Sequence, residues 1–149
     1  MTCETMKPSH IDEVAKLQVE WADESITYGV TAGTVEQIAE AMTDFCYIMK
    51  HKDRIIGYLM AEVRDSNEYC VFPKGVRFIE VHDLFVTNDY RSYGVGKKLL
   101  EHCEQEALTA GIKHILISSA TKDADAVRNF YMNKNDYKIW TTQFFKHLD

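Results

Sequence analysis

The segment that most constrains the fold of this chain runs from Val81 to Leu100. It begins as an apolar strand, passes through a polar turn to the closely spaced Gly94 and Gly96, and continues as a helix. At such a junction the N–H groups of the loop point toward one place, where the positive end of the helix dipole also lies. The two glycines leave room for an oxyanion to touch the main chain, which a β-carbon would obstruct. The segment therefore favours a site for a phosphate or pyrophosphate, and hence for a nucleotide-bearing cofactor.

The rest of the chain predicts a mixed α/β architecture. Apolar residues at helical spacing predict helices over 10–22, 34–42, 95–110 and 124–133. Short or alternating apolar runs predict strands over 2–7, 45–50, 55–63, 78–86 and 114–118, with two more in the tail 137–148, and residues 65–76 form a loop. The unit around Gly94 is a right-handed crossover between parallel strands, whereas the hairpins at either end imply antiparallel pairing. We expect a single domain over residues 1–149, with a mixed sheet of about six to seven strands and about four helices.

The composition disfavours several classes of function. The net charge of −6 argues against binding to nucleic acid or to an anionic membrane surface. No apolar run is long enough to span a bilayer, and the first residues lack the basic flank and apolar stretch of a signal peptide. The histidines form no H-E-x-x-H motif and the cysteines no C-x-x-C pair, so we expect no metal. The scattered cysteines favour reduced thiols in a cytoplasmic protein; they are Cys3, Cys46, Cys70 and Cys103.

The glycine loop differs from two familiar nucleotide-binding loops. A dinucleotide-binding fingerprint needs three glycines in G-x-G-x-x-G near the first strand, but this loop has two and follows residue 90. A Walker A loop needs G-x-x-x-x-G-K-S/T, which the segment from Gly94 to Lys98 does not provide. Taken alone, the R-x-x-G-x-G pattern is also compatible with a helix start whose glycines serve packing only.

The context of the loop is more specific than the glycines. Leu84-Phe85-Val86, a polar turn and then Arg91-x-x-Gly94-x-Gly96-x-x-Leu99-Leu100 resemble motif A of the GNAT superfamily of N-acetyltransferases. The resemblance continues through the strand at 114–118 and the segment Asn129-Phe130-Tyr131, and it covers essentially the whole chain in element order. It implies a GNAT-like fold with two parallel middle strands that splay apart, and acetyl-CoA as the cosubstrate.

The resemblance also implies which residues hold acetyl-CoA. The pantetheine arm would pair with the open edge of the strand that ends at Leu84, Phe85 and Val86, in the manner of an added strand. A backbone N–H there could polarise the thioester carbonyl. Asn129 would contact the pantetheine, and Lys97 could add charge at the helix start, although a solvated lysine is the alternative. Backbone N–H groups would hold the pyrophosphate, from Arg91, Ser92, Tyr93, Gly94, Val95 and Gly96.

A general base is needed because an ammonium group has no lone pair with which to attack. Glu80 and His82 lie on one face of their strand by alternation, and each matches a base position in some members of the superfamily. Either side chain could instead be an ordinary surface residue. Asp83 faces away from both in a regular strand, but a bulge would redirect it, so that it could hold a cationic substrate or cap a loop.

Tyr131 resembles the family tyrosine that gives a proton to the departing thiolate of CoA. The alternative is a tyrosine packed between helix and sheet. The chain departs from the family pattern here. Ala124 replaces a common asparagine, Asp136 replaces a glycine, and the spacing from Tyr131 to Tyr137 is one residue longer.

These features predict an enzyme that moves the acetyl group of acetyl-CoA to a primary amine by direct attack, with a small molecule as the favoured acceptor. The altered segment after Tyr131 is compatible with a second hypothesis, a non-catalytic module that binds acyl-CoA. A third hypothesis differs only in the acceptor, which would be a protein amine. The resemblance also makes a homodimer possible.

Overall fold

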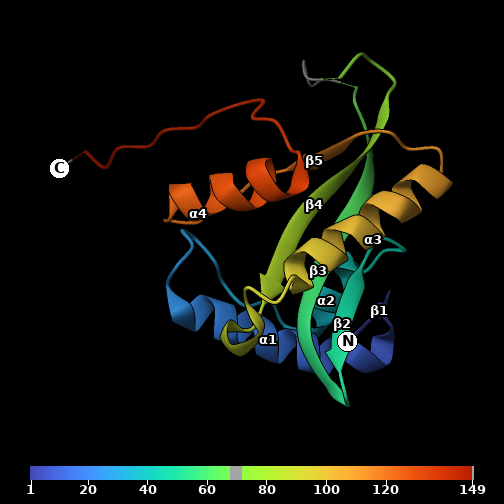
Figure 1. Ribbon diagram of the computed structural model, residues 1–149, viewed down its shortest axis with the longest axis vertical. Coiled ribbons are helices and arrows are strands. Elements are labelled where there is room, and N and C mark those ends of the chain that lie inside the picture. The colour runs from blue at the N-terminus through green and yellow to red at the C-terminus, as the bar shows by residue number, and fades with distance from the viewer. Residues whose placement is uncertain (68–71, 149) are drawn as a thin grey trace.

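The sheet of this protein follows the order of its strands along the chain, β1-β2-β3-β4-β5 (Figure 1). The computed structural model describes residues 1–67 and 72–148. The first three pairings are antiparallel and the last, between β4 and β5, is parallel. The predicted mixed sheet is therefore confirmed. Its strands are β1 (Thr2–Thr5), β2 (Tyr47–His51), β3 (Arg54–Asp65), β4 (Arg77–Val86) and β5 (Ile115–Ile117).

Helices cover both faces of the sheet. They are α1 (Ile11–Glu24), α2 (Val35–Ala41), α3 (Val95–Thr109) and α4 (Ala124–Arg128), with a π-helical turn at Asn129–Asn133 and short 3-10 turns at Pro8–His10 and Asn88–Tyr90. The α2 helix begins at a capping box, because the Thr34 side chain accepts from Gln37 N and the Gln37 side chain accepts from Thr34 N. The helices predicted from apolar spacing thus form with boundaries within a few residues of those expected.

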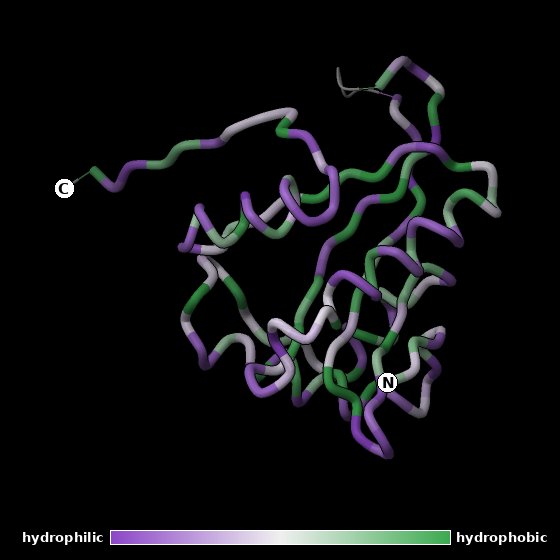
Figure 2. The backbone as a smooth tube through the Cα atoms, in the orientation of Figure 1, coloured by the Kyte–Doolittle hydropathy of each residue, from purple (hydrophilic) through white to green (hydrophobic). Residues whose placement is uncertain are grey.

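Two hydrophobic clusters hold the layers together. On one face, α1 and α2 pack on residues such as Tyr58 and Phe85, whereas α3 packs on the other face against residues such as Leu59 and Ile79. The central strand β3 is buried from Ile55 to Ala61, since its side chains contact helices on both sides. Hydrophobic residues gather in these central strands, while hydrophobic and hydrophilic residues alternate along α3 (Figure 2).

Two irregularities in β4 shape the region where a ligand could bind. Met60 of β3 pairs with Asp83, but its neighbour Ala61 pairs with Val81, so His82 is an extra residue that forms a β-bulge. The parallel strand β5 pairs with β4 only up to Val81. Beyond that point the two strands diverge, as the resemblance to GNAT proteins predicts, and this edge of β4 has no partner strand among the described residues.

The prediction of two strands in the tail is wrong. Residues 137–148 have no regular secondary structure, so the described chain has five strands rather than six or seven. The tail runs away from the sheet beyond α4 (Figure 1), and Phe144 and Phe145 are exposed. Aromatic residues favour strands because they pack on a neighbouring strand or helix, whereas in this tail the Phe145 ring contacts the loop residue Tyr28, with ring centroids 5.2 Å apart. Part of the predicted loop at 65–76, residues 68–71 with Cys70, lies outside the described residues.

None of the described helices combines the length and apolar character needed to cross a membrane.

Candidate active site

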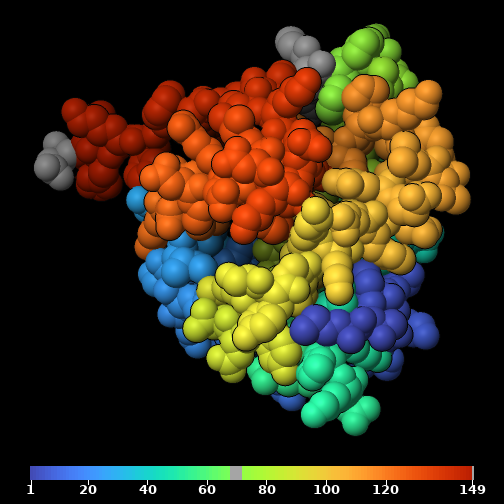
Figure 3. Space-filling model, viewed as in Figure 1, coloured from blue at the N-terminus to red at the C-terminus, as the bar shows by residue number. Residues whose placement is uncertain are grey.

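A cavity of about 300 Å³ opens where β4 and β5 diverge. Figure 3 shows the surface hollowed where α4, the α1 region and the loop before α3 meet. Five segments contribute to its wall: the end of α1, the loop after it, the bulged part of β4, the end of β5 with the residues that follow, and the π-helical turn. The lining residues are Gln18, Trp21, Thr27, Tyr28, Gly29, Val30, Thr31, Val81, His82, Asp83, Leu84, Ile117, Ser118, Ser119, Ala120, Thr121 and Tyr131.

One wall of the cavity is a short ladder between segments far apart in the sequence. Tyr28 N donates to Ala120 O at 3.0 Å, and Lys122 N donates to Ile26 O at 2.9 Å. Trp21 Nε1 anchors this loop to α1 by donating to Thr27 Oγ1 at 3.1 Å. The ladder fixes the loop after α1 against the loop after β5 and so gives the cavity a defined wall.

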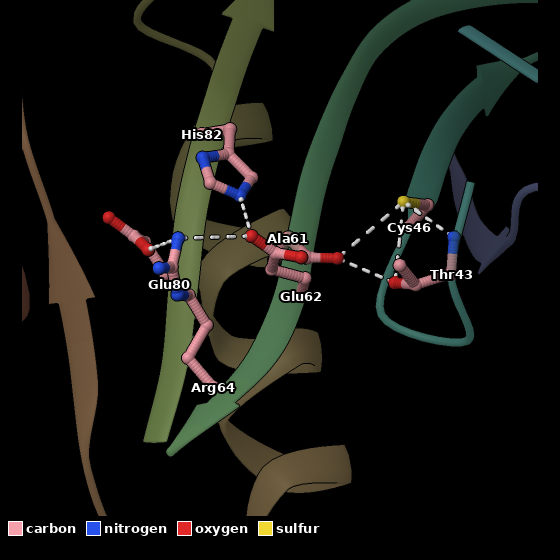
Figure 4. A network of polar contacts seen from close by, with 7 residues as sticks. All are labelled: Thr43, Cys46, Ala61, Glu62, Arg64, Glu80 and His82. Carbon is pink, nitrogen blue, oxygen red and sulfur yellow. Dashed lines mark hydrogen bonds and ion pairs between the residues drawn. The ribbon is translucent and has the colours of Figure 1, made fainter. Parts of the chain in front are cut away.

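His82 and Glu80 belong to a charged network across β3 and β4 (Figure 4). His82 Nε2 lies 2.9 Å from Glu62 Oε1, and Arg64 Nη1 lies 3.0 Å from Glu80 Oε2 and 3.5 Å from Glu62 Oε1. His82 lines the cavity, whereas Glu80 is not among the lining residues. Of the two predicted bases, the structure therefore brings only His82 to the cavity.

Glu62, Glu80 and His82 also bring three potential metal-ligating atoms within 4.8 Å of one another. The guanidinium group of Arg64 pairs with both carboxylates of this group. Its positive charge offsets part of their negative charge and would repel a metal cation. The arrangement is therefore better suited to orienting the His82 ring than to holding a metal.

Asp83 lies at the cavity because of the bulge. The extra residue interrupts the alternation of β4, so the consecutive His82 and Asp83 both line the cavity. Gln18 Nε2 donates to Asp83 Oδ2 at 3.1 Å, and Gln18 Oε1 accepts from Gly33 N at 2.8 Å. Burial raises the pKa of Asp83, against smaller opposing effects of His82, Gln18 and Tyr58. A cationic ligand beside this carboxylate would favour its ionised form.

Tyr131 lines the cavity from the π-helical turn at Asn129–Asn133. Burial raises the pKa of its hydroxyl to about 12, so it is a neutral phenol near pH 7. The departures from the family pattern are absorbed locally. The π-helical turn at Asn129–Asn133 accommodates one extra residue, and Asp136 takes the left-handed φ of 57° in the place of a glycine. Tyr137 N then donates to Tyr131 O at 2.9 Å, which closes the turn.

The N-terminus of α3 has the features of an anion site. Gly94 is its N-cap, with a φ of 78°, and a β-carbon there would meet nothing within 4 Å. The first N–H groups of a helix have no partner within it and can bind an anion. Gly96 also has a packing role, because a β-carbon at this position would lie 3.2 Å from Phe130 Cζ. Its small size allows α3 to pack closely against the π-helical turn.

The other predicted residues of this loop differ in their surroundings. Arg91 N donates to Asn88 O at 3.2 Å, and the Arg91 side chain binds Val86 O at 2.8 Å and Glu24 Oε2 at 2.6 Å. Arg91 therefore braces β4 against α1, and its own N–H is already used. Ser92 has a left-handed φ of 66° and Tyr93 is exposed.

Beyond Arg91, Val95 and Lys97 lie on opposite sides of the start of α3. Val95 is buried in the core under α3. Lys97 Nζ, which is exposed, lies 3.5 Å from Lys134 O and 3.7 Å from Glu101 Oε1. The Lys97 side chain is thus free of buried contacts, as the solvated alternative implies, while it stays next to the helix N-terminus.

The end of β4 and the π-helical turn hold the remaining predicted residues. Leu84 lines the cavity, Phe85 is buried and stacks on Trp21 with ring centroids 5.6 Å apart, and Val86 packs on the α3 face. Asn129 is exposed, and its Oδ1 accepts from Asn133 Nδ2 at 3.3 Å. Only the main chain of this part of β4 is left to pair with a ligand.

Three residues of the site were missed from the sequence: Gln18, Glu62 and Arg64. Gln18 is a polar residue on the apolar face of α1, which is a signal of a buried polar contact. Glu62 and Arg64 alternate at the end of a strand, a pattern that is common on solvated faces and carries no functional signal by itself.

Comparisons with known proteins show the family of this chain. The model of the family described as "Acetyltransferase (GNAT) family" matches residues 11–136. An uncharacterized N-acetyltransferase of Lactobacillus delbrueckii subsp. lactis is 25% identical over 104 residues, which are 70% of this chain. The match spans only 55% of that relative's length.

Solved structures with low sequence identity share the fold. A mutant form of the BH1408 protein of Bacillus halodurans has a TM-score of 0.79 at 14% identity, covering 99% of this chain and 100% of that one. An aminoglycoside acetyltransferase from an uncultured soil metagenomic sample, in complex with trehalose, has a TM-score of 0.74 at 16% identity, covering 99% and 96%. The aminoglycoside N-acetyltransferase AAC(6')-Iy, in complex with CoA, has a TM-score of 0.71 at 15% identity, covering 99% and 100%.

Proposed function

Because this chain belongs to the GNAT family of acetyltransferases, we propose that it transfers the acetyl group of acetyl-CoA to a primary amine of a small molecule. One observation carries the proposal. A single cavity at the divergence of β4 and β5 brings together a histidine and a carboxylate from β4 and a neutral tyrosine from the π-helical turn. These are the groups needed to bind an ammonium ion, remove its proton and protonate a leaving thiolate.

The described residues fit acetyl-CoA, which when bound supplies an acetyl thioester. The open edge of β4 from His82 to Val86 offers main-chain groups to the pantetheine arm. The N-terminus of α3, with open space at Gly94, offers N–H groups to the pyrophosphate. We assign these contacts to residues 92–97, and to Arg91 the task of holding the loop in place. Asn129 and Lys97 border the same region.

Asp83 and His82 share the activation of the amine in this proposal. Asp83 binds the ammonium form, since its carboxylate is the one acidic group of the cavity wall among the described residues. His82 takes the proton, directly or through water, and Glu62 orients the imidazole ring. Glu80 is the alternative base, but its pairing with Arg64 and its place outside the lining favour His82.

Tyr131 completes the reaction as the proton donor to the leaving thiolate. Its raised pKa keeps the hydroxyl protonated near pH 7. A backbone N–H at the open edge of β4 stabilises the developing oxyanion. No covalent intermediate with the protein is needed, because the amine and the thioester lie in one cavity.

The direct test follows the release of free thiol from acetyl-CoA over a panel of small primary amines. We expect turnover with at least one amine, and a loss of roughly 100-fold or more in kcat/KM for His82→Gln but only a few-fold for Glu80→Gln. Binding of acetyl-CoA without turnover on any amine would contradict the proposal, and a larger effect of Glu80→Gln would reassign the base.

We propose a cytoplasmic location as well. The described cysteines Cys3, Cys46 and Cys103 are free thiols, which supports a reducing compartment. The homodimer expected from the resemblance stays a prediction, and light scattering after size-exclusion chromatography tests it.

A further inference from the structure

The charge of the cavity lining restricts the choice of acceptor amine more closely than membership of the acetyltransferase family does. Among the lining residues that the structure describes, Asp83 is the only acidic one, and none is a lysine or arginine. We infer that the acceptor is a compact amine with a single positive charge and an aromatic or apolar body, and that polycationic amines are poor substrates. This inference rests on the proposed function.

The acidic residues near this region already have partners. Glu62, which contacts the cavity-lining His82, also pairs with Arg64. The Glu20 carboxylate accepts from Thr87 Oγ1, and both carboxylate oxygens of Glu24 pair with Arg91, at 2.8 Å and 2.6 Å. An ion-paired carboxylate offers little to a second cation, since the existing partner must first be displaced. Glu24 therefore adds no anchoring point beyond Asp83 for a further ammonium group, and the Glu20 carboxylate already has a hydroxyl donor.

A lysine just outside the cavity lining, beside Tyr28, opposes a second cation. Lys122 Nζ donates to Ser25 O at 2.7 Å and lies 5.1 Å from the centroid of the Tyr28 ring, which lines the cavity. Its positive charge is held beside the loop after α1. A polyamine that had one ammonium group at Asp83 and extended past Tyr28 would meet this positive charge and be repelled by it.

The remaining wall suits the body of the acceptor. Trp21, Tyr28 and Tyr131 provide aromatic surface, and Trp21 is held rigid by its stacking on Phe85. Hydroxyl groups of the loops add hydrogen-bonding capacity without charge. The volume of about 300 Å³ is at the lower end of the range for small-molecule sites, which favours a compact ligand.

The test compares a monocation, 2-phenylethylamine, with two polycations, spermine and kanamycin. We measure binding by calorimetry and turnover by thiol release, at fixed salt. The expected result is a preference of about 10-fold or more for 2-phenylethylamine in both Kd and kcat/KM. Asp83→Asn should raise the KM for 2-phenylethylamine about 10- to 100-fold and leave the KM for acetyl-CoA unchanged.

Charge reversal at two lysines provides a second test and its matched control. Lys122→Glu should improve the kcat/KM for spermine several-fold, whereas Lys113→Glu, an exposed lysine outside this cavity, should not. Equal or tighter binding of spermine or kanamycin would overturn the inference on the acceptor and leave the proposed function intact. Selective binding of 2-phenylethylamine with no turnover of any amine would uphold the charge selectivity and overturn the proposed function.

Discussion

His82 Nε2 lies 2.9 Å from Glu62 Oε1, across the pairing of β3 with β4. Glu62 is directly opposite Glu80 in the register, so the contact with His82 is diagonal and occurs next to the bulge. A carboxylate on one ring nitrogen fixes the orientation of an imidazole and leaves the other nitrogen for a substrate. We therefore treat Glu62 as a positioning residue for His82.

Glu62→Gln should lower kcat about 10-fold without changing the KM for acetyl-CoA. Glu62→Asp keeps a carboxylate and should therefore recover part of the kcat that Glu62→Gln loses. Steady-state kinetics of both variants measure kcat and the KM for acetyl-CoA. Glu40→Gln, an exposed change on α2, is the control. Equal losses of kcat in the glutamine and aspartate variants would indicate a structural role only.

Tyr131→Phe removes the proposed proton donor and keeps the ring. We expect kcat to fall about 10- to 100-fold while acetyl-CoA still binds normally, because the ring packing on Phe130 and Tyr137 is preserved. Since burial raises the pKa of Tyr131 to about 12, the wild-type rate should show no loss from this group up to about pH 10. An unchanged kcat in the phenylalanine variant would assign Tyr131 to packing alone.

The sequence predicts the local parts of the site better than the parts set by pairing. The glycine loop, the helix that follows it and the histidine at position 82 depend on short-range patterns and were found. The placement of Asp83 depends on one extra residue in β4, whose position is set by the pairing with β3 rather than by a local signal. Alternation alone would have placed Asp83 on the opposite face from His82.

In the tail, residues 137–148, strand propensity alone leads to a wrong prediction. Residues such as Ile139, Trp140 and Phe144 have strand propensity, but they are exposed and have no regular structure. Strand propensity measures how well a side chain packs on a sheet, and a chain that runs away from the sheet gains nothing from it. The role of Gly96 was likewise hidden, because its contact with Phe130 joins segments more than thirty residues apart.

Asp83→Asn should raise stability at neutral pH. Burial raises the folded-state pKa of Asp83, so the ionised carboxylate destabilises the fold. Below the unfolded-state pKa of about 3.9 the carboxyl group is protonated in both states, so this cost is absent. The cost grows as the pH rises from there through the raised folded-state pKa, and it is constant at higher pH. The gain of the variant should therefore be present at pH 7 and vanish at pH 3. Urea unfolding at both values measures it, with the exposed Asp44→Asn as control; an equal gain at pH 3 would contradict the cause given.

Gly94→Ala should weaken acetyl-CoA binding through the backbone at the N-terminus of α3. Gly94 and Gly111 both have left-handed φ values, 78° and 74°, with open space where a β-carbon would lie. They lie at opposite ends of α3. Alanine at either position should cost about 1 kcal/mol of stability, because both positions impose the same conformational strain on it. Only the Gly94 variant should raise the Kd for acetyl-CoA, by about 5-fold or more, because the N–H groups of its loop are those proposed to bind the pyrophosphate. Equal Kd values for the two variants in isothermal titration calorimetry would remove the N-terminus of α3 from the cofactor site.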